Sequence, residues 1–150
     1  MRVAKVFADT NIVLRAFHDD FAEHASVRAL LDLYIASDAQ IFISRQVIRE
    51  YLVQVTHPRT FVEPLSIESL SKHLHQITRI CIVLDETERV TAHLMKLIGA
   101  YPTRGKQIHD ANLVATMLAY EIDTLLTLNV ADLKRFGDKI KIVSLEEGNK

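Results

Sequence analysis

Short apolar segments alternate along the whole chain with longer segments of helical periodicity. The short segments are rich in β-branched and aromatic residues, which is typical of buried strands, and they lie at residues 2–8, 40–43, 80–84, 124–127 and 140–143. Between them, apolar residues recur every three or four positions. This spacing predicts helices over 11–17 and 21–36, and further helices that begin near 44, 66, 85, 107 and 131. Strands separated by helices need crossover connections, so we expect an α/β fold: a three-layer α/β/α sandwich with a mainly parallel central sheet.

Local signals fix several of the helix ends. Ser44 is placed to cap the helix that follows the second strand, and Ser66 begins the next helix. Asp85 with Glu88 three residues later matches a capping box, which predicts that the following helix begins at that pair. Two prolines mark residues 58–65 as the one extended loop.

Composition limits the class of protein. The 150 residues are 49% hydrophobic and show no linker or repeat, so we expect a single domain over residues 1–150. Eighteen basic and nineteen acidic side chains give a net charge of −1, so a polyanionic partner would have to be held locally. The single cysteine, Cys81, lies in a predicted strand and indicates a buried thiol in a reducing compartment. No signal segment or membrane span is visible, and we expect a cytoplasmic protein without a membrane partner.

Polar residues that follow predicted strands are the first candidates for a site, because ligands of open parallel sheets bind beyond the carboxyl ends of the strands. Asp9 and Asn11 follow the first strand, and Thr127 and Asn129 end the fourth. Asp110 lies on the apolar stripe of its helix, so an acidic side chain is predicted to point inward. Helix capping or a first-turn contact with the helix dipole is the alternative role for these residues.

The doubly wound sheet would gather Asp9, Asp110 and Asn129 at one edge. Clustered carboxylates raise one another's pKa unless a cation neutralises them. Oxygen ligands without cysteine suit Mg²⁺ or Mn²⁺, and this combination points to phosphodiester or phosphoryl chemistry. Glu50, midway along the helix after the second strand, is either part of this site or a solvated surface charge.

At these residues the chain resembles the PIN-domain ribonucleases, in particular the VapC-like toxins of toxin-antitoxin pairs. The shared features are the strand that ends in Asp9-Thr10-Asn11, Glu50 in the helix after Ser44, the helix opened by Asp110, and the closing segment 125–133. The resemblance covers essentially the whole chain. It implies a metal-dependent endoribonuclease, a hydrolase that cuts RNA phosphodiester bonds.

The resemblance also implies roles for individual residues. Asp9, Glu50 and Asp110 would be the catalytic, metal-binding carboxylates, and Asn11 and Thr127 would support their pocket. The family motif commonly reads Thr-x-Asp where this chain has Thr127-Leu128-Asn129, so Asn129 would be a weaker fourth ligand. Asp132, three residues later, is the alternative carboxylate, and the departure puts a second metal ion in doubt.

Basic side chains near these positions are candidates for contacts with RNA. Arg104 and Lys106 lie just before Asp110 and are the first candidates to hold the RNA backbone. The other basic candidates, for which a solvated surface is the alternative, are Arg45, Arg49, Lys134, Arg135, Lys139 and Lys141.

Histidines contribute less to the prediction. His109 is adjacent to Asp110, where it either assists acid-base chemistry or has a structural or surface role. His73 and His75 are two positions apart on a predicted helix and cannot share a face, so they do not form a metal site.

Three functions remain open from the sequence. The first is an Mg²⁺- or Mn²⁺-dependent endoribonuclease, a homodimer with an antitoxin partner. The second is a catalytically weak RNA-binding or assembly module, motivated by Asn129. The third, a haloacid-dehalogenase-like phosphatase, needs a second aspartate two residues after Asp9, where this chain has Asn11.

Overall fold

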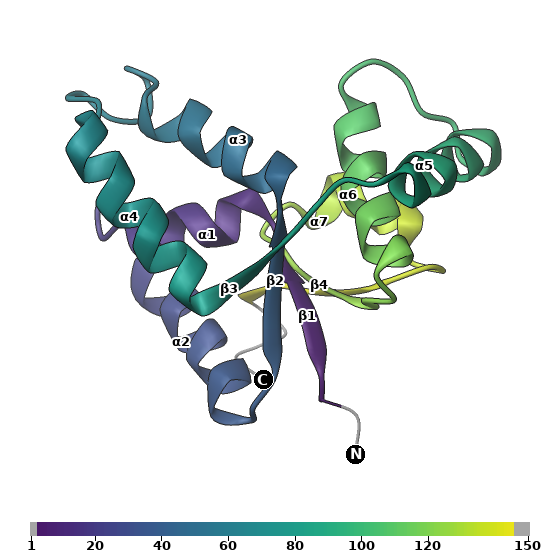
Figure 1. Cartoon of the computed structure of the whole chain (residues 1–150), viewed down its shortest axis with the longest axis horizontal. Helices are drawn as coiled ribbons and strands as arrows, with labels where there is room; N and C mark the ends of the chain where they lie inside the picture. Colours follow the sequence, from purple (N-terminus) through teal and green to yellow (C-terminus); the bar gives the residue numbers. More distant parts are fainter. Residues whose placement is uncertain (1–2, 146–150) are drawn as a thin grey trace.

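The computed structural model describes residues 3–145 and contains one five-stranded parallel sheet (Figure 1). The strands lie in the order β3 (Cys81–Leu84), β2 (Gln40–Ser44), β1 (Lys5–Ala8), β4 (Thr124–Leu126) and β5 (Lys141–Val143). In the centre of the sheet Phe7 is in register with Phe42 on β2 and with Leu125 on β4. All neighbouring pairs are parallel, which confirms the predicted fold class.

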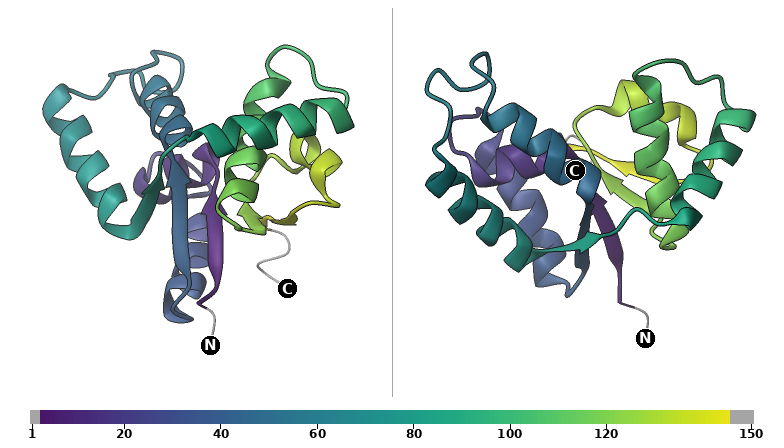
Figure 2. Two further views of the ribbon diagram at one scale, coloured as in Figure 1. Left: turned by 45° about the vertical axis from the view of Figure 1, so that its right-hand side comes forward. Right: turned by 45° about the horizontal axis from the view of Figure 1, so that its top comes forward.

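Helices cover both faces of the sheet. The helices α1 (Thr10–Phe17), α2 (His24–Ala36), α3 (Arg45–Val55) and α4 (Ile67–Ile80) lie on one side. The helices α5 (Glu88–Ala100), α6 (Gln107–Ala119) and α7 (Val130–Leu133) lie on the other side with the 3-10 turn η1 (Lys134–Phe136), as Figures 1 and 2 show. Among residues 3–145, no helix is both long and apolar enough to cross a bilayer.

The central strands form the core of the molecule. Phe7, Ile43 and Leu125 have no exposed surface, as expected for strands with helices on both faces. Cys81 is buried at the start of β3, and desolvation raises the pKa of its thiol to about 12. The prediction of a buried cysteine is therefore confirmed, and its thiol is not poised to react.

Most of the predicted helix ends are confirmed, and the capping box is wrong. The hydroxyl groups of Ser44 and Ser66 accept hydrogen bonds from the backbone in the first turns of α3 and α4. The N-cap of α5 is Thr87 rather than Asp85, whose carboxylate accepts a hydrogen bond from Arg45 of α3 instead. An ion pair with a neighbouring helix thus replaces the local cap.

Two local details also differ from the prediction: the start of the first strand and the role of Asn129. The first strand begins at Lys5, and the part of the predicted strand at Arg2 lies outside the described residues. Asn129 directly precedes α7 but its side chain makes no capping bond, so the capping alternative is wrong for this residue. The Asn129 side chain instead donates a hydrogen bond to Asp132.

The chain reverses its direction of winding at β1. The connections that lead from β1 through β2 to β3 run along one half of the sheet, and β4 then pairs with the other side of β1. At such a switch point, the loops after the two adjacent strands separate and leave a crevice at the carboxyl edge. The crevice is expected beyond Ala8 of β1 and Leu126 of β4.

A buried histidine ties three helices together on the α1–α4 side. His18 follows α1 and is 5% exposed. Its Nε2 atom lies 2.6 Å from the Tyr51 hydroxyl of α3, and its ring stacks on His73 of α4 with centroids 4.5 Å apart. Burial, with a smaller contribution from His73, lowers the pKa of His18 to about 4. His73 therefore has a structural packing contact with His18.

The depressed pKa of His18 predicts a loss of stability in acid. The unfolded chain takes up this proton near pH 6.5, but the folded protein takes it up only near pH 4. The free energy of unfolding should therefore fall between these values by about 2–3 kcal/mol more in the wild type than in His18→Gln. Urea unfolding at a series of pH values measures the slope, with the exposed His75→Gln as a control that keeps it. Equal slopes for the wild type and His18→Gln would contradict the assignment.

Candidate functional site

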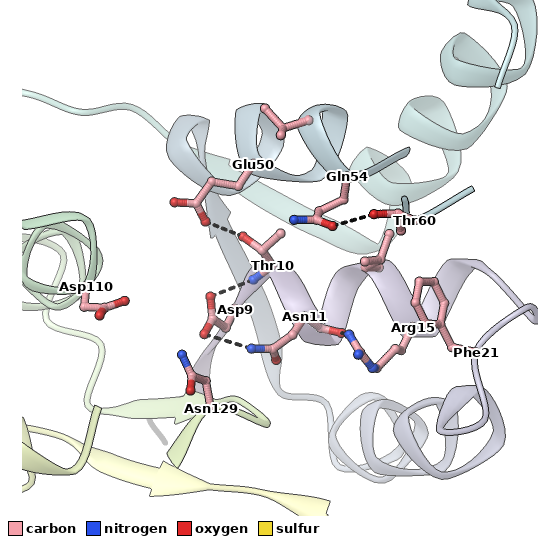
Figure 3. Close-up of a pocket in the computed structure, with 12 residues that line it drawn as sticks. Asp9, Thr10, Asn11, Arg15, Phe21, Glu50, Gln54, Thr60, Asp110 and Asn129 are labelled. Carbon is pink, nitrogen blue, oxygen red and sulfur yellow. Dashed lines mark hydrogen bonds between the residues drawn. The ribbon is translucent and has the colours of Figure 1, made fainter. Parts of the chain in front are cut away.

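A cavity of about 570 Å³ opens at the carboxyl edge of the sheet, where the switch point predicts a crevice (Figure 3). It lies between the two groups of helices. The residues that line it are Asp9, Thr10, Asn11, Leu14, Arg15, Phe21, Glu50, Val53, Gln54, Thr60, Asp110 and Asn129. The structure therefore brings together Asp9, Glu50, Asp110 and Asn129, which the sequence analysis had singled out.

Asp9 is the most buried acidic group of the cavity, with 8% of its surface exposed. Its Oδ1 atom accepts a hydrogen bond of 2.7 Å from the backbone N–H of Thr10, which makes it the N-cap of α1. Its Oδ2 atom accepts from the Thr127 hydroxyl at 2.8 Å and from the Asn11 amide at 3.3 Å. Desolvation raises the pKa of Asp9, and these hydrogen bonds oppose the shift. Asp9 thus caps α1 and lines the cavity at the same time, so the two alternative roles are compatible.

Asn11 and Thr127 join the ends of β1 and β4. The Asn11 amide also donates to the Thr127 hydroxyl at 3.3 Å, and its Oδ1 atom accepts from the backbone N–H of Leu128 at 2.9 Å. The Thr127 hydroxyl accepts a further bond from the backbone N–H of Asn129. Asn11 therefore lines the cavity, whereas Thr127 is not a lining residue and contacts the lining residue Asp9.

Glu50 is half-buried and both of its carboxylate oxygens are bonded. Oε2 accepts from the Thr10 hydroxyl at 2.7 Å, and Oε1 accepts from the Gln46 amide at 2.9 Å. Figure 3 shows the side chain directed from α3 toward Thr10 and the cavity. The alternative of a freely solvated surface charge is therefore wrong.

Asp110 faces Asp9 and Glu50 from the opposite wall, in the first turn of α6 (Figure 3). Burial raises the pKa of Asp110 to about 6, and the charges of Asp132, Asp9 and Glu50 add to the shift. Arg135 opposes it. The acidic groups of the cavity therefore repel one another, which is the electrostatic condition that a bound cation relieves.

Asn129 lines the cavity, whereas Asp132 is not among the lining residues. The Asn129 amide donates a hydrogen bond of 2.9 Å to the Asp132 carboxylate, which is exposed. Asp132 thus lies behind Asn129 and acts on the cavity through its charge on Asp110.

The donor chemistry of the cavity fits a hard divalent cation. Every candidate ligand is a carboxylate or amide oxygen, and the cavity leaves room for coordinating water, which Mg²⁺ retains in proteins. Within residues 3–145, no group of three or more His, Cys, Asp or Glu side chains is arranged closely enough to hold an ion. The carboxylates surround a shared space and do not converge on one point.

The basic candidates lie outside this cavity. Arg104 and Lys106 are exposed on the turn before α6 and are not lining residues. Arg45 and Arg49 form ion pairs with Asp85 and Glu86. Three basic side chains of the C-terminal candidate patch are exposed: Lys134, Lys139 and Lys141.

Arg135, the remaining basic candidate, holds the chain in place before α6. Its guanidinium donates hydrogen bonds to the backbone carbonyls of Pro102, at 2.6 Å, and Gln107, at 3.4 Å. It therefore has a structural contact in addition to its charge. The side chain of His109 is exposed, and its backbone carbonyl accepts from Gln46.

Sequence reasoning missed several residues of the site. Thr10 and Gln46 orient Glu50, and Arg15 lines the cavity while pairing with Glu23 at 3.0 Å. Gln46 lies four residues before Glu50, a helical spacing that places both side chains on one face. This spacing of four residues could have identified Gln46 as a partner of Glu50 from the sequence.

Comparisons with known proteins agree with the fold. The sequence model of the PIN domain family matches residues 6–139. No curated protein matches the chain. Among solved structures, VapBC2 from Rickettsia felis, bound to a promoter DNA fragment, is similar with a TM-score of 0.68 and 19% identity, covering 93% of this chain and 98% of that one.

Two further structures have the same fold. VapBC-1 from nontypeable Haemophilus influenzae has a TM-score of 0.67 and 17% identity, with coverage of 95% and 98%. VapC20 from Mycobacterium tuberculosis, described as a toxin that cleaves the sarcin-ricin loop, has a TM-score of 0.62 and 13% identity, with coverage of 87% and 94%.

The raised pKa of Asp110 predicts that this residue destabilises the metal-free protein. Between pH 3.8 and about 6 the unfolded chain loses the proton first, so the contribution of Asp110 to stability falls as the pH rises through this range. Asp110→Asn should raise the free energy of unfolding by about 1–2 kcal/mol at pH 8, with a smaller effect at pH 4.5. Urea unfolding with EDTA measures this difference. A destabilised Asp110→Asn protein at pH 8 would contradict it.

Proposed function

The chain belongs to the PIN domain family, and we propose that it is an endoribonuclease that hydrolyses RNA phosphodiester bonds with a divalent cation, Mg²⁺ or Mn²⁺. The observation that carries this proposal is the meeting of Asp9, Glu50 and Asp110 in one cavity from three separate elements. Their mutual repulsion supports a cation, and the family relationship supports a phosphodiester as the substrate.

In the proposed enzyme, Asp9, Glu50 and Asp110 hold the cation and Asn129 offers a fourth, weaker oxygen ligand. A bound divalent cation lowers the pKa of water and stabilises the charge that develops on a phosphate. The chain itself supplies rigid placement, because Asp9 and Glu50 accept hydrogen bonds on both of their oxygens. An orientation fixed in advance reduces the reorganisation that the reaction requires.

One residue of the cavity and two on the turn beside it are the proposed contacts for the nucleic acid. Asn129 is placed to orient a water molecule or a phosphate oxygen, and Arg104 and Lys106 are placed to bind the RNA backbone next to the helix that carries Asp110. Neither basic side chain has an ion-pair partner within residues 3–145, so both are available to phosphates.

We also propose the setting of this activity. The similar structures include VapBC and other toxin-antitoxin complexes, which supports a toxin restrained by an antitoxin protein. We further propose that the toxin is a homodimer in the cytoplasm. The single domain predicted for residues 1–150 would carry the whole activity, since all the proposed ligands lie in one cavity.

A second candidate function is an RNA-binding or assembly module that turns over weakly. Asn129 favours it, because an amide oxygen binds a cation less strongly than a carboxylate does. Such a module would retain RNA in a binding assay without releasing cut products.

Removal of any one of the three carboxylates should abolish cleavage. Asp9→Asn, Glu50→Gln and Asp110→Asn keep the shape of each side chain and remove a charge, so each should reduce the rate by about 100-fold or more. A single-turnover assay on labelled RNA with Mn²⁺ measures the rate, and excess EDTA should stop the reaction. Asp85→Asn, an exposed acid outside the cavity, serves as the control. Unchanged cleavage in the three variants would refute the proposed site.

Replacement of Asn129 discriminates between the two candidate functions. Asn129→Asp adds a carboxylate to the cavity and should lower the Mn²⁺ concentration that gives half-maximal cleavage, by about 10-fold. Cleavage and RNA retention are measured on the same samples. If wild-type protein retains RNA without product and Asn129→Asp restores cleavage, the binding module is the correct description of this chain.

A further inference from the structure

A buried amide connects the two walls of the cavity. Gln46 of α3 is 5% exposed, and both of its amide hydrogens and its amide oxygen are hydrogen-bonded within the protein. Its Nε2 atom donates to Glu50 Oε1 at 2.9 Å and to the backbone carbonyl of His109 at 2.8 Å. Its Oε1 atom accepts from the Asn112 amide at 2.7 Å. One side chain thus contacts a carboxylate on α3 and the backbone next to Asp110 on α6.

Few other contacts in the described part of the chain join α3 to α6. The helices α3 and α6 lie on opposite sides of the sheet (Figures 1 and 2), and the cavity separates Glu50 from Asp110. Within the described part of the chain, Gln46 makes both hydrogen bonds that join α3 directly to α6. The charges of Glu50 and Asp110 repel each other across this gap. The hydrogen bonds of Gln46 therefore hold α3 and α6 together against this repulsion.

Asn112 fixes which way the Gln46 amide faces. The Nδ2 atom of Asn112 has two hydrogens: one bonds Gln46 Oε1 and the other bonds Glu86 Oε1 at 2.5 Å. Glu86 is held in turn by Arg49 of α3 at 3.3 Å. If the Gln46 amide turned over, its oxygen would face the Glu50 carboxylate and the His109 carbonyl, which are both acceptors. The network therefore has one orientation that pairs every donor with an acceptor.

We infer that Gln46 is a positioning residue that fixes Glu50 relative to the backbone beside Asp110, and that Asn112 maintains the orientation of the Gln46 amide. This inference rests on the proposed function, because it assumes that both carboxylates bind the cation. Residues that hold the ligands of a metal in place contribute to its affinity without touching the ion. Neither Gln46 nor Asn112 lines the cavity.

Two variants test the inference at different points of the network. Gln46→Leu removes the amide while keeping an apolar side chain in the buried position. Asn112→Asp keeps the shape of the side chain but presents only acceptors to Gln46 Oε1 and Glu86. Both variants should raise the dissociation constant for Mn²⁺ by about 10-fold or more, although neither changes a proposed ligand. Asn112→Asp keeps the test decisive if Gln46→Leu does not fold.

The measurement is calorimetric titration of the RNA-free protein with Mn²⁺, after circular dichroism has shown a folded chain. Gln76→Leu is the control, because Gln76 is an exposed glutamine of α4 that does not line the cavity. Its Mn²⁺ affinity should equal that of the wild type. In cleavage assays, saturating Mn²⁺ should restore kcat of Gln46→Leu to within about threefold of the wild type, since a lost positioning contact weakens cation affinity.

The possible results separate the two claims. Weakened Mn²⁺ binding in both network variants, with an unchanged Gln76→Leu control, supports the positioning role. Unchanged affinity in a folded Asn112→Asp or Gln46→Leu protein overturns it and leaves the proposed function intact. A wild-type protein that neither binds Mn²⁺ nor cleaves RNA overturns the proposed function and this inference with it.

Discussion

Asp9 lies buried at the carboxyl end of the central strand, and the arrangement of the whole site follows from the need to satisfy its oxygens. A carboxylate removed from water is costly unless donors surround it. Thr10, Asn11 and Thr127 supply those donors, and in doing so they join β1 to the loop after β4. Thr10 then uses its hydroxyl to hold Glu50. The polar groups that compensate one buried acid thus determine where the second acid lies.

Asp110 is treated differently by the fold. Burial and the surrounding acids raise the pKa of Asp110. Within residues 3–145, no hydrogen bond to its carboxylate is found. The structure holds Asp9 and Glu50 rigidly and leaves Asp110 in an unfavourable field. Such a division is common at functional sites, where local stability is given up for a charge arrangement that a ligand completes.

The sequence was sufficient to predict the layers of the fold, because the strands and helices have different hydrophobic periods and the helical crossovers imply parallel strands. It also placed Asp9, Asp110 and Asn129 at one edge, since that edge follows from the topology. Glu50 needed the family resemblance, because its side chain has no apolar period that would mark it as inward facing.

Side-chain networks were harder to foresee from one sequence. The partner of Asp85 is Arg45, forty residues away, and this ion pair replaced the predicted capping box. Gln46 and Asn112 meet across 66 residues, and nothing local in either helix specifies that contact. Short-range chemistry can be predicted from neighbours in sequence, whereas contacts between distant helices depend on the final packing.

The hydrogen bond between Thr127 and Asp9 spans 118 residues, which has a consequence for the growing chain on the ribosome. Chains are made from the N-terminus at about 5–20 residues per second, and pairings between distant segments form slowly. The first strand and Glu50 emerge early, but the cavity lacks a wall until α6 and β4 have been synthesised and docked. A nascent chain therefore carries Asp9 and Glu50 in an unassembled form until α6 and β4 have been synthesised and docked.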